Sequence, residues 1–185
     1  MPSAIDTTIG GANANSYVAI GGVGGADAYF DDRPSATAWT GATTDDKTRA
    51  LLEATRRLQR QNWLGGKVTA IQALAWPRVG VQKVDQVGAG YTFGWGYGYS
   101  YGYGYLNEVY RTDEIPLPVK HAEMELALFL LINGAPPVPN TRRITSFSAD
   151  GLSVNYEYIG IATALPDEVN GLISALIEGN KLVRG

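Results

Sequence analysis

The feature that most constrains the fold is a tract in the middle of the chain where glycine alternates with aromatic residues, at positions 88–105. Seven of the 11 tyrosines lie between Tyr91 and Tyr110. In an extended strand this alternation places the aromatic rings on one face and glycine on the other. Glycine loses the most conformational entropy on ordering and has no side chain to pack, so such a strand is weak. The tract can contribute little to a folded core, and we expect it to form a contact loop or an extended hairpin.

Helical patterns dominate the rest of the chain. The clearest follows Thr43 and Thr44, either of which can cap a helix, with Asp45 in the first turn, where the helix dipole favours anions. Apolar residues then recur at helical spacing from Leu51 to Leu58. Further helices are expected over residues 26–33, from Pro116 or Pro118 to about Ile132, and from the opening Leu165-Pro166-Asp167-Glu168 onward.

One of these helices ends in the run LALFLLI, at residues 126–132, which is apolar on every side. Such a helix end must be buried on several sides, either in the core or between subunits. Farther on, residues 143–158 have the pattern of a β-hairpin around the turn signal Asp150-Gly151. Together these patterns predict a mainly α fold, namely a small helical bundle of about three to four helices with one β-hairpin and extended N- and C-terminal arms.

One connection has a distinctive sequence, IQALAWPRVG at residues 71–80. Trp76 is expected to be extended, because the residue before a proline avoids the helical region. An apolar stretch that ends in tryptophan and is broken at once by proline and arginine indicates an ordered loop held by a buried indole.

Composition limits the chemistry available to the chain. Its 185 residues suit one domain, and 15 Lys+Arg against 18 Asp+Glu leave a net charge of −3, which argues against a protein held on nucleic acid by bulk positive charge. The absence of cysteine excludes disulfides and thiolate metal sites, and the single histidine excludes a histidine-rich metal centre. No apolar run has the roughly 18 residues that a membrane-spanning helix needs. We expect no metal, no cofactor and no membrane partner.

The catalytic motifs in the chain lack the context that they require. Residues 98–102 match G-x-S-x-G, but a nucleophile elbow needs a buried strand, a helix and a histidine–acid pair, and here the neighbours are glycine and tyrosine. The carboxylate pairs, such as Glu123 and Glu125, are explained as caps or solvated helix faces. His121, beside Lys120, is better explained as a surface or interface residue. We therefore expect no enzyme and no catalytic residue.

Two groups of residues are candidate contact sites. Arg56, Arg57 and Arg60 could contact phosphate or pair with another subunit. They are explained as well by a solvated helix face, on which cations near the C-terminal end interact favourably with the helix dipole. The aromatic tract could stack on single-stranded bases, but residues 84–108 contain no Lys or Arg to follow a phosphate backbone. Tyrosine gives a large contact area at low entropy cost, which favours a loop that contacts protein. Its contact residues would be Trp95, Tyr97, Tyr99, Tyr101, Tyr103 and Tyr105.

Several strings, taken in order, resemble one known family. They are Asn15-Ser16-Tyr17-Val18, Ala26-Asp27-Ala28-Tyr29-Phe30, a lone Trp39, Ala50-Leu51 with Ala54-Thr55, Gln72-Ala73-Leu74-Ala75-Trp76-Pro77-Arg78, and Ile115-Pro116 at a helix start. Together they resemble the head-tail connector (adaptor) proteins of tailed bacteriophages, whose members are often labelled DnaT-like single-stranded DNA-binding proteins. The resemblance covers about residues 13–82 and 112–180. Its most specific part is ALAWPR. The family pattern has no counterpart to residues 84–110, so the resemblance implies that they are an inserted loop or hairpin.

The resemblance implies a structural protein of the virion neck, at the portal vertex, that is found in the host cytoplasm during assembly. Its copies, typically twelve, would form a homo-oligomeric ring under the portal protein, extend the DNA channel and dock the stopper, the tail or another neck protein. Genomic double-stranded DNA would pass through the lumen without sequence-specific binding. The C-terminal segment would insert into the portal through Lys181, Leu182, Val183 and Arg184.

The expected organisation is an N-terminal arm at residues 1–25, a single helical adaptor domain at 26–182 that carries the insertion, and a C-terminal tail at 178–185. Two other functions stay open. An enzyme would need a cofactor or His121. A single-stranded DNA-binding protein of phage replication would stack bases on its Tyr and Trp rings and hold the backbone with Arg56, Arg57, Arg60, Arg142 or Arg143.

Overall fold

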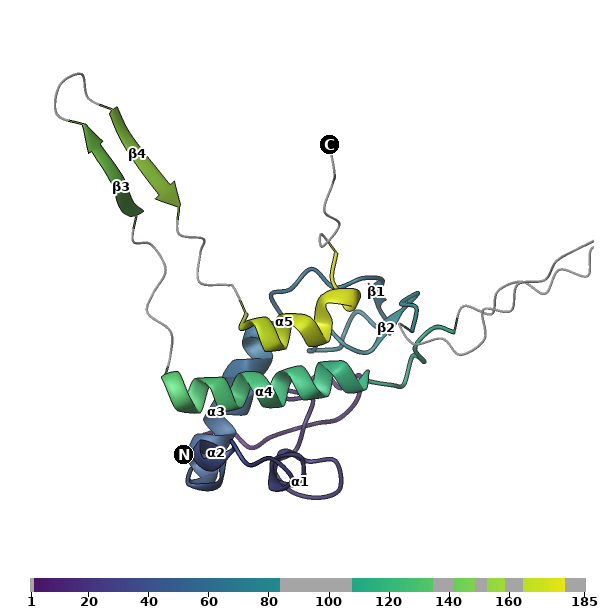
Figure 1. Cartoon of the computed structure of the whole chain (residues 1–185). Coiled ribbons are helices and arrows are strands. Elements are labelled where there is room, and N and C mark those ends of the chain that lie inside the picture. Colours follow the sequence, from purple (N-terminus) through teal and green to yellow (C-terminus); the bar gives the residue numbers. More distant parts are fainter. Residues whose placement is uncertain (1, 84–107, 135–141, 149–152, 159–164, 179–185) are drawn as a thin grey trace, which may run out of the picture.

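The computed structural model of the chain describes residues 2–83, 108–134, 142–148, 153–158 and 165–178. These residues are mainly helical, with an antiparallel β-hairpin, as the sequence predicts (Figure 1). They contain more helices than the three to four expected, partly because a short helix surrounds Trp39, where we expected a connection. The elements in chain order are α1 (Ala26–Asp31), α2 (Thr37–Thr40), α3 (Thr44–Leu58), β1 (Gly66–Lys67), β2 (Arg78–Val79), α4 (Leu117–Asn133), β3 (Arg142–Ser148), β4 (Ser153–Tyr158), α5 (Asp167–Ile173) and the 3₁₀ helix η1 (Ser174–Leu176).

Helix α4 is the centre of the helical body (Figure 1). Every residue from 122 to 128 is buried. Helices α3 and α5 pack against α4, and α2 contacts it as well. The chain's own helices therefore cover most of the apolar run at 126–132, so it lies in the core, one of the two locations that the sequence left open. The last turn of α4 emerges from the body, where Ile132 is 59% exposed.

Helix α3 forms where the sequence predicts it and for the predicted reasons. Thr43 caps it, because its hydroxyl oxygen accepts a hydrogen bond from the Asp46 backbone N–H at 3.2 Å. Leu51 and Leu58 belong to a buried stripe, and α3 packs against α4. After the helix ends, the Trp63 indole N–H donates to the Leu58 carbonyl at 2.9 Å. This bond satisfies one of the carbonyls that a helix end leaves free.

Residues 2–20 form no helix or strand, and they lie against the body. Ala14, Tyr17 and Val18 are buried in the core. Two parts of the path are held together, since the Asp6 N–H donates to the Asn15 side-chain oxygen at 2.8 Å and the Asn15 N–H donates to the Asp6 carbonyl at 2.9 Å. The segment for which we expected an arm therefore contributes core residues.

The last described residues close the body against the segment that follows α3. Helix α5 buries Val169 and Ile173 and packs against α4. Beyond η1 the Leu64 N–H donates to the Leu176 carbonyl at 2.9 Å, and Trp63 forms an antiparallel bridge with Ile177. Residues before and after the aromatic tract are thereby joined in one helical body.

Strands β3 and β4 form the predicted hairpin. They pair antiparallel, with Ser148 opposite Ser153, and the register shifts between Ile144 and Ser146. Such an irregularity is a β-bulge, which bends the strand locally. The predicted turn at Asp150-Gly151 lies outside the described residues, in the stretch that the Ser148–Ser153 pair brackets.

Candidate functional surfaces

Most residues predicted to contact partners lie outside the described residues. The same holds for the G-x-S-x-G match at residues 98–102 and for the side chains at positions 142 and 143. The structure does describe how the aromatic tract joins the body. The predicted contact residues outside the described ranges are Trp95, Tyr97, Tyr99, Tyr101, Tyr103 and Tyr105 in the tract and Lys181, Leu182, Val183 and Arg184 in the tail.

The two ends of the tract meet in an antiparallel pairing of residues 81–83 with 108–110, which we call the insertion root. The Lys83 N–H donates to the Glu108 carbonyl at 2.7 Å, and the Tyr110 N–H donates to the Val81 carbonyl at 2.9 Å. The Lys83 ammonium also lies 3.5 Å from the Glu108 carboxylate. Residues 84–107 therefore leave the body and rejoin it at one place, which is the geometry that an insertion requires.

The insertion root rests on the tryptophan that the sequence singles out. Trp76 is 1% exposed, so the predicted burial is confirmed. Its ring packs edge to face on Tyr110, at 5.9 Å between centroids, and on Trp63, at 5.8 Å. The peptide bond from Trp76 to Pro77 is cis. One aromatic cluster thus connects the segment after α3, the ALAWPR loop and the insertion root.

Arg78 directs its guanidinium at the backbone of the same region. Its N–H groups donate to the carbonyls of Leu64 at 2.6 Å, Trp63 at 3.2 Å and Ala75 at 3.3 Å, and to that of Gly65. A planar guanidinium with five donors can hold several carbonyls at once, which an ammonium on a flexible stem does less well. In this fold the arginine of the ALAWPR string fastens the loop to the chain after α3.

The arginines predicted as phosphate or subunit contacts lie near the C-terminal end of α3, and two of them share an internal partner. Glu53 lies 3.1 Å from Arg57 and 3.7 Å from Arg56. Arg60 is exposed. Pairs three or four residues apart on one helix stabilise it slightly. Arg56, whose side chain is 71% exposed, fits the interpretation of a solvated helix face, whereas the Arg57 side chain is only 19% exposed.

A carboxylate that the sequence assigned to a solvated face lies at the centre of the body instead. Glu123 of α4 is fully buried. One of its oxygens accepts from the Tyr17 N–H at 2.9 Å, and the other contacts the hydroxyls of Ser16 at 2.6 Å and Thr55 at 2.7 Å. Burial raises the pKa of Glu123 to about 7. The solvated-face interpretation is wrong here, because this carboxyl joins the N-terminal segment, α3 and α4.

Glu125 is also buried, but it has partners of its own. It accepts from the Tyr29 hydroxyl at 2.6 Å and pairs with Arg33. Glu123 and Glu125 thus contact different elements and do not share a proton or a substrate position. The half-buried ring of His121 lies 4.8 Å from that of Tyr29, and burial, followed by the charge of Arg33, lowers the pKa of His121.

The described part of the chain contains no metal-binding cluster and no membrane-spanning helix. None of its His, Asp and Glu side chains form a group of three or more that could hold a metal ion. None of its helices is both long and apolar enough to cross a membrane.

Comparison with known proteins finds a match to one family model. The family is described as "Putative DnaT-like ssDNA binding protein", and the match covers residues 1–90. No curated protein and no solved structure matches the chain. The matched part contains α1 to α3, the ALAWPR loop and the segment that contacts Glu123. Nothing in the match points to head-to-tail connection. Over its first 90 residues the chain is similar to a family named for single-stranded DNA binding.

Proposed function

We propose that this protein is a structural head-to-tail adaptor of a tailed bacteriophage, whose copies form a ring under the portal, extend the DNA channel and dock the stopper or tail. The observation that carries the proposal is how the body uses its cations. Among the Lys and Arg side chains that the structure describes, all but Arg60 and Lys120 contact acceptors of the same chain. Cations that pair with acceptors of their own chain are less available to bind the phosphates of a nucleic acid.

The insertion root gives a second support. Residues 84–107 are flanked by the antiparallel pairing of residues 81–83 with 108–110, and they contain no Lys or Arg. An adaptor must contact other proteins on both sides of a ring, and a tyrosine-rich segment without cations suits contacts with protein better than contacts with DNA.

Electron cryo-microscopy of the particle neck, combined with mass spectrometry of purified particles, tests this proposal. We expect a ring of this chain directly under the portal. Absence of the chain from mature particles, with the protein free in the lysate of infected cells, would overturn the adaptor function.

A second function, single-stranded DNA binding in phage replication, is favoured by the description of the matched family. It predicts tight binding of short oligonucleotides by the free protein, with an affinity that falls steeply between about 50 and 200 mM salt. Fluorescence anisotropy measures both quantities. Under this function a variant with Arg56→Ala and Arg60→Ala would bind less tightly and with a smaller salt dependence. The control is Arg111→Ala, because Arg111 is about as exposed as Arg56, lies outside α3 and is held by Asp113 at 2.9 Å, closer than the 3.7 Å between Arg56 and Glu53. The adaptor function predicts no such binding.

A further inference from the structure

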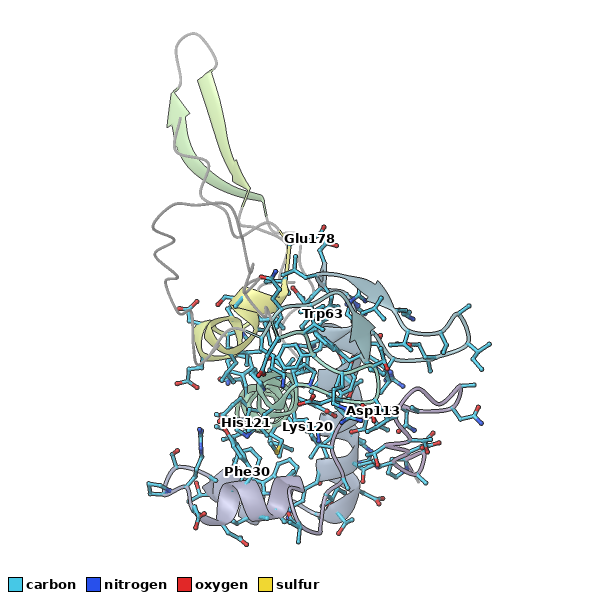
Figure 2. The ribbon with its side chains drawn as sticks, turned by 90° about the vertical axis from the view of Figure 1, so that its right-hand side faces the viewer. Phe30, Trp63, Asp113, Lys120, His121 and Glu178 are labelled. Carbon is cyan, nitrogen blue, oxygen red and sulfur yellow. The ribbon has the colours of Figure 1, made fainter. Side chains whose placement is uncertain are left out.

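A groove runs along one face of the first turns of α4. It consists of two adjoining hollows of about 240 and 230 Å³, which share Gly24 and Lys120 among their lining residues. Helix α4 contributes Leu117, Lys120, His121 and Met124, whose spacing of three or four residues places them on one face. The other wall comes from the loop at residues 20–25 and from α1. Figure 2, which looks along α4, shows Lys120 and His121 on the side that faces α1. We call this feature the α4 groove.

Three exposed aliphatic side chains lie at the rim of the α4 groove, which is open to solvent. Leu117 is 61% exposed and Val23 is fully exposed, while Ile9 is about half exposed. All three belong to the lining of the two hollows. A partner that covers these exposed aliphatic side chains binds more favourably by roughly 25 cal/mol per Å² of apolar surface removed from water.

Lys120 supplies the charge of the groove. It is the one Lys, Arg, Asp or Glu in the lining, and it has no ion-pair partner among the described residues. By contrast, Lys47 pairs with a carboxylate, Lys83 with another, and Lys67 donates to a carbonyl. Charge complementarity therefore favours a partner that places a carboxylate next to an apolar side chain.

The opposite side of the body carries that combination. Helix α5 lies across α4 from α1 and α2 (Figure 1). Val169 and Ile173 are the buried residues of α5, and the flank of the helix beside them carries Glu168, which is exposed, and Leu172, which is half-buried and packs in part against the core. These two residues are four positions apart, so a carboxylate and an aliphatic side chain lie side by side on the helix surface.

We propose that the α4 groove binds the flank of α5 of a second copy of this chain, with Lys120 paired to Glu168 and Leu117 packed against the exposed part of Leu172. The inference rests on the proposed ring function and names its subunit contact. The two surfaces differ and lie on opposite sides of the body, so one copy can bind one neighbour through its groove and another through α5. Head-to-tail contacts of this kind close into a ring when the rotation from copy to copy allows it.

Cysteine cross-linking tests the contact directly, because the chain has no cysteine of its own. One preparation carries Leu117→Cys and another carries Leu172→Cys, and the two are mixed at high protein concentration and oxidised. The matched control replaces Leu117→Cys with Ile132→Cys, since Ile132 lies at the other end of α4 and is 59% exposed, against 61% for Leu117. We expect several-fold more disulfide-linked dimer with Leu117→Cys. Equal yields from the two mixtures would overturn the proposal.

A charge exchange tests the ion pair separately. Lys120→Glu and Glu168→Lys should each weaken self-association, as measured by sedimentation velocity, and the double variant should recover it. Lys67→Glu is the control, because Lys67 is exposed and lies outside the groove. A double variant that associates no better than the single variants would show that the two residues do not pair.

The outcomes separate this contact from the proposed function. A ring under the portal without cross-linking between positions 117 and 172 would leave the adaptor function standing and this contact wrong. Cross-linking in a protein absent from particles would support the contact and overturn the adaptor function. If a maleimide reagent labels Leu117→Cys poorly at every protein concentration, the chain's own residues cover the groove and the proposed contact is wrong.

Discussion

Glu123 shows how one buried carboxyl can order several segments. Its Oε1 lies 2.6 Å from the Ser16 hydroxyl and 2.7 Å from the Thr55 hydroxyl, and these hydroxyls lie 2.7 Å from the Val18 carbonyl and 2.9 Å from the Leu51 carbonyl. Each contact between two oxygens needs a hydrogen, and each hydroxyl supplies one. The two hydroxyls supply two hydrogens for these four contacts, so an ionised Glu123 leaves two contacts without a hydrogen. A protonated Glu123 supplies a third hydrogen. Hydrogen count and burial both favour the neutral form.

The free energy of unfolding should therefore decrease as the pH rises from about 5 to about 8. Folding raises the Glu123 pKa from 4.5 to about 7, so the folded state keeps a proton that the unfolded chain releases in this range. This contribution is complete below the unfolded pKa and is lost as the pH rises through the folded one. At about 1.4 kcal/mol per pKa unit it amounts to roughly 3 kcal/mol. Urea unfolding at several pH values measures it.

The matched variant is Glu123→Gln, whose amide cannot ionise. Its stability should vary less with pH and should exceed that of the wild type near pH 8. Glu123→Ala should be less stable at every pH, because the Tyr17 N–H loses its acceptor in the core. The same pH dependence in the wild type and in Glu123→Gln would show that another group titrates.

Arg78 supports a second prediction for a single residue. Arg78→Lys should lower the free energy of unfolding by about 1–3 kcal/mol, because one ammonium cannot reach the carbonyls that the guanidinium holds together. The control is Arg56→Ala, since the Arg56 side chain is 71% exposed and contacts Glu53 only at 3.7 Å. That change should alter stability by at most about 0.5 kcal/mol. Equal stabilities of Arg78→Lys and the wild type in chemical denaturation would contradict the structural role of Arg78.

The sequence predicts the burial of Trp76 but not that of Glu123, although it contains a signal for both. Glu123 lies four residues after Val119 and three before Leu126, so it falls on the apolar stripe of its helix. A carboxyl on such a stripe requires buried donors. The side-chain donors come from Ser16 and Thr55, which are 107 and 68 residues away in sequence. No local sequence pattern predicts partners that are so far away along the chain.

At the scale of elements, the periodicity of apolar residues predicts where a helix lies but not which elements pack against it. The one-sided stripe of α3 predicts a single packing face, and the structure confirms it. The apolar run of α4 covers all sides of the helix, so the sequence does not show which elements bury it. In the structure α3 and α5 pack against α4. The apolar spacing at the C-terminal helix continues to Leu176, yet α5 ends at Ile173 and a 3₁₀ turn follows. A short helix that contains Gly171 has little propensity to extend further.

The ALAWPR loop gives a prediction at the same scale. Trp76→Ala should lower the free energy of unfolding by about 3–5 kcal/mol, because the indole fills the space between Trp63 and Tyr110. Trp76→Phe should cost much less. Its ring keeps part of the packing, and it removes an indole N–H that is buried without an acceptor among the described residues. Thermal melting compares the three proteins, and an unchanged curve for Trp76→Ala would contradict this role.

At the scale of the whole molecule, local patterns predict the helices, the hairpin and the place of the insertion. The body depends as well on pairings between distant segments, namely residues 62–64 with 176–178 and 81–83 with 108–110. Hydrophobic spacing reports on neighbours within about two helical turns, so it carries no information on such pairings. The α4 groove escaped the sequence analysis for the same reason, since its walls come from residues about a hundred positions apart.

The insertion root leads to a prediction for the whole chain. Deleting residues 94–104 should leave the helical body folded, with a melting temperature close to that of the wild type. The pairing of residues 81–83 with 108–110 lies outside the deletion, and shortening a loop lowers the entropy cost of closing it. Tyr110→Ala is the contrasting variant, because it keeps the tract but removes the ring that packs on Trp76.

Differential scanning calorimetry should therefore show a larger loss for this one substitution than for the loss of the whole segment. Loss of the cooperative transition in the deletion variant would show that the tract belongs to the core, and the insertion interpretation would then be wrong. A deletion variant that folds and enters particles, but fails to attach tails, would make the tract a docking element. Folding and docking would then depend on different parts of one chain, with the insertion root as the boundary between them.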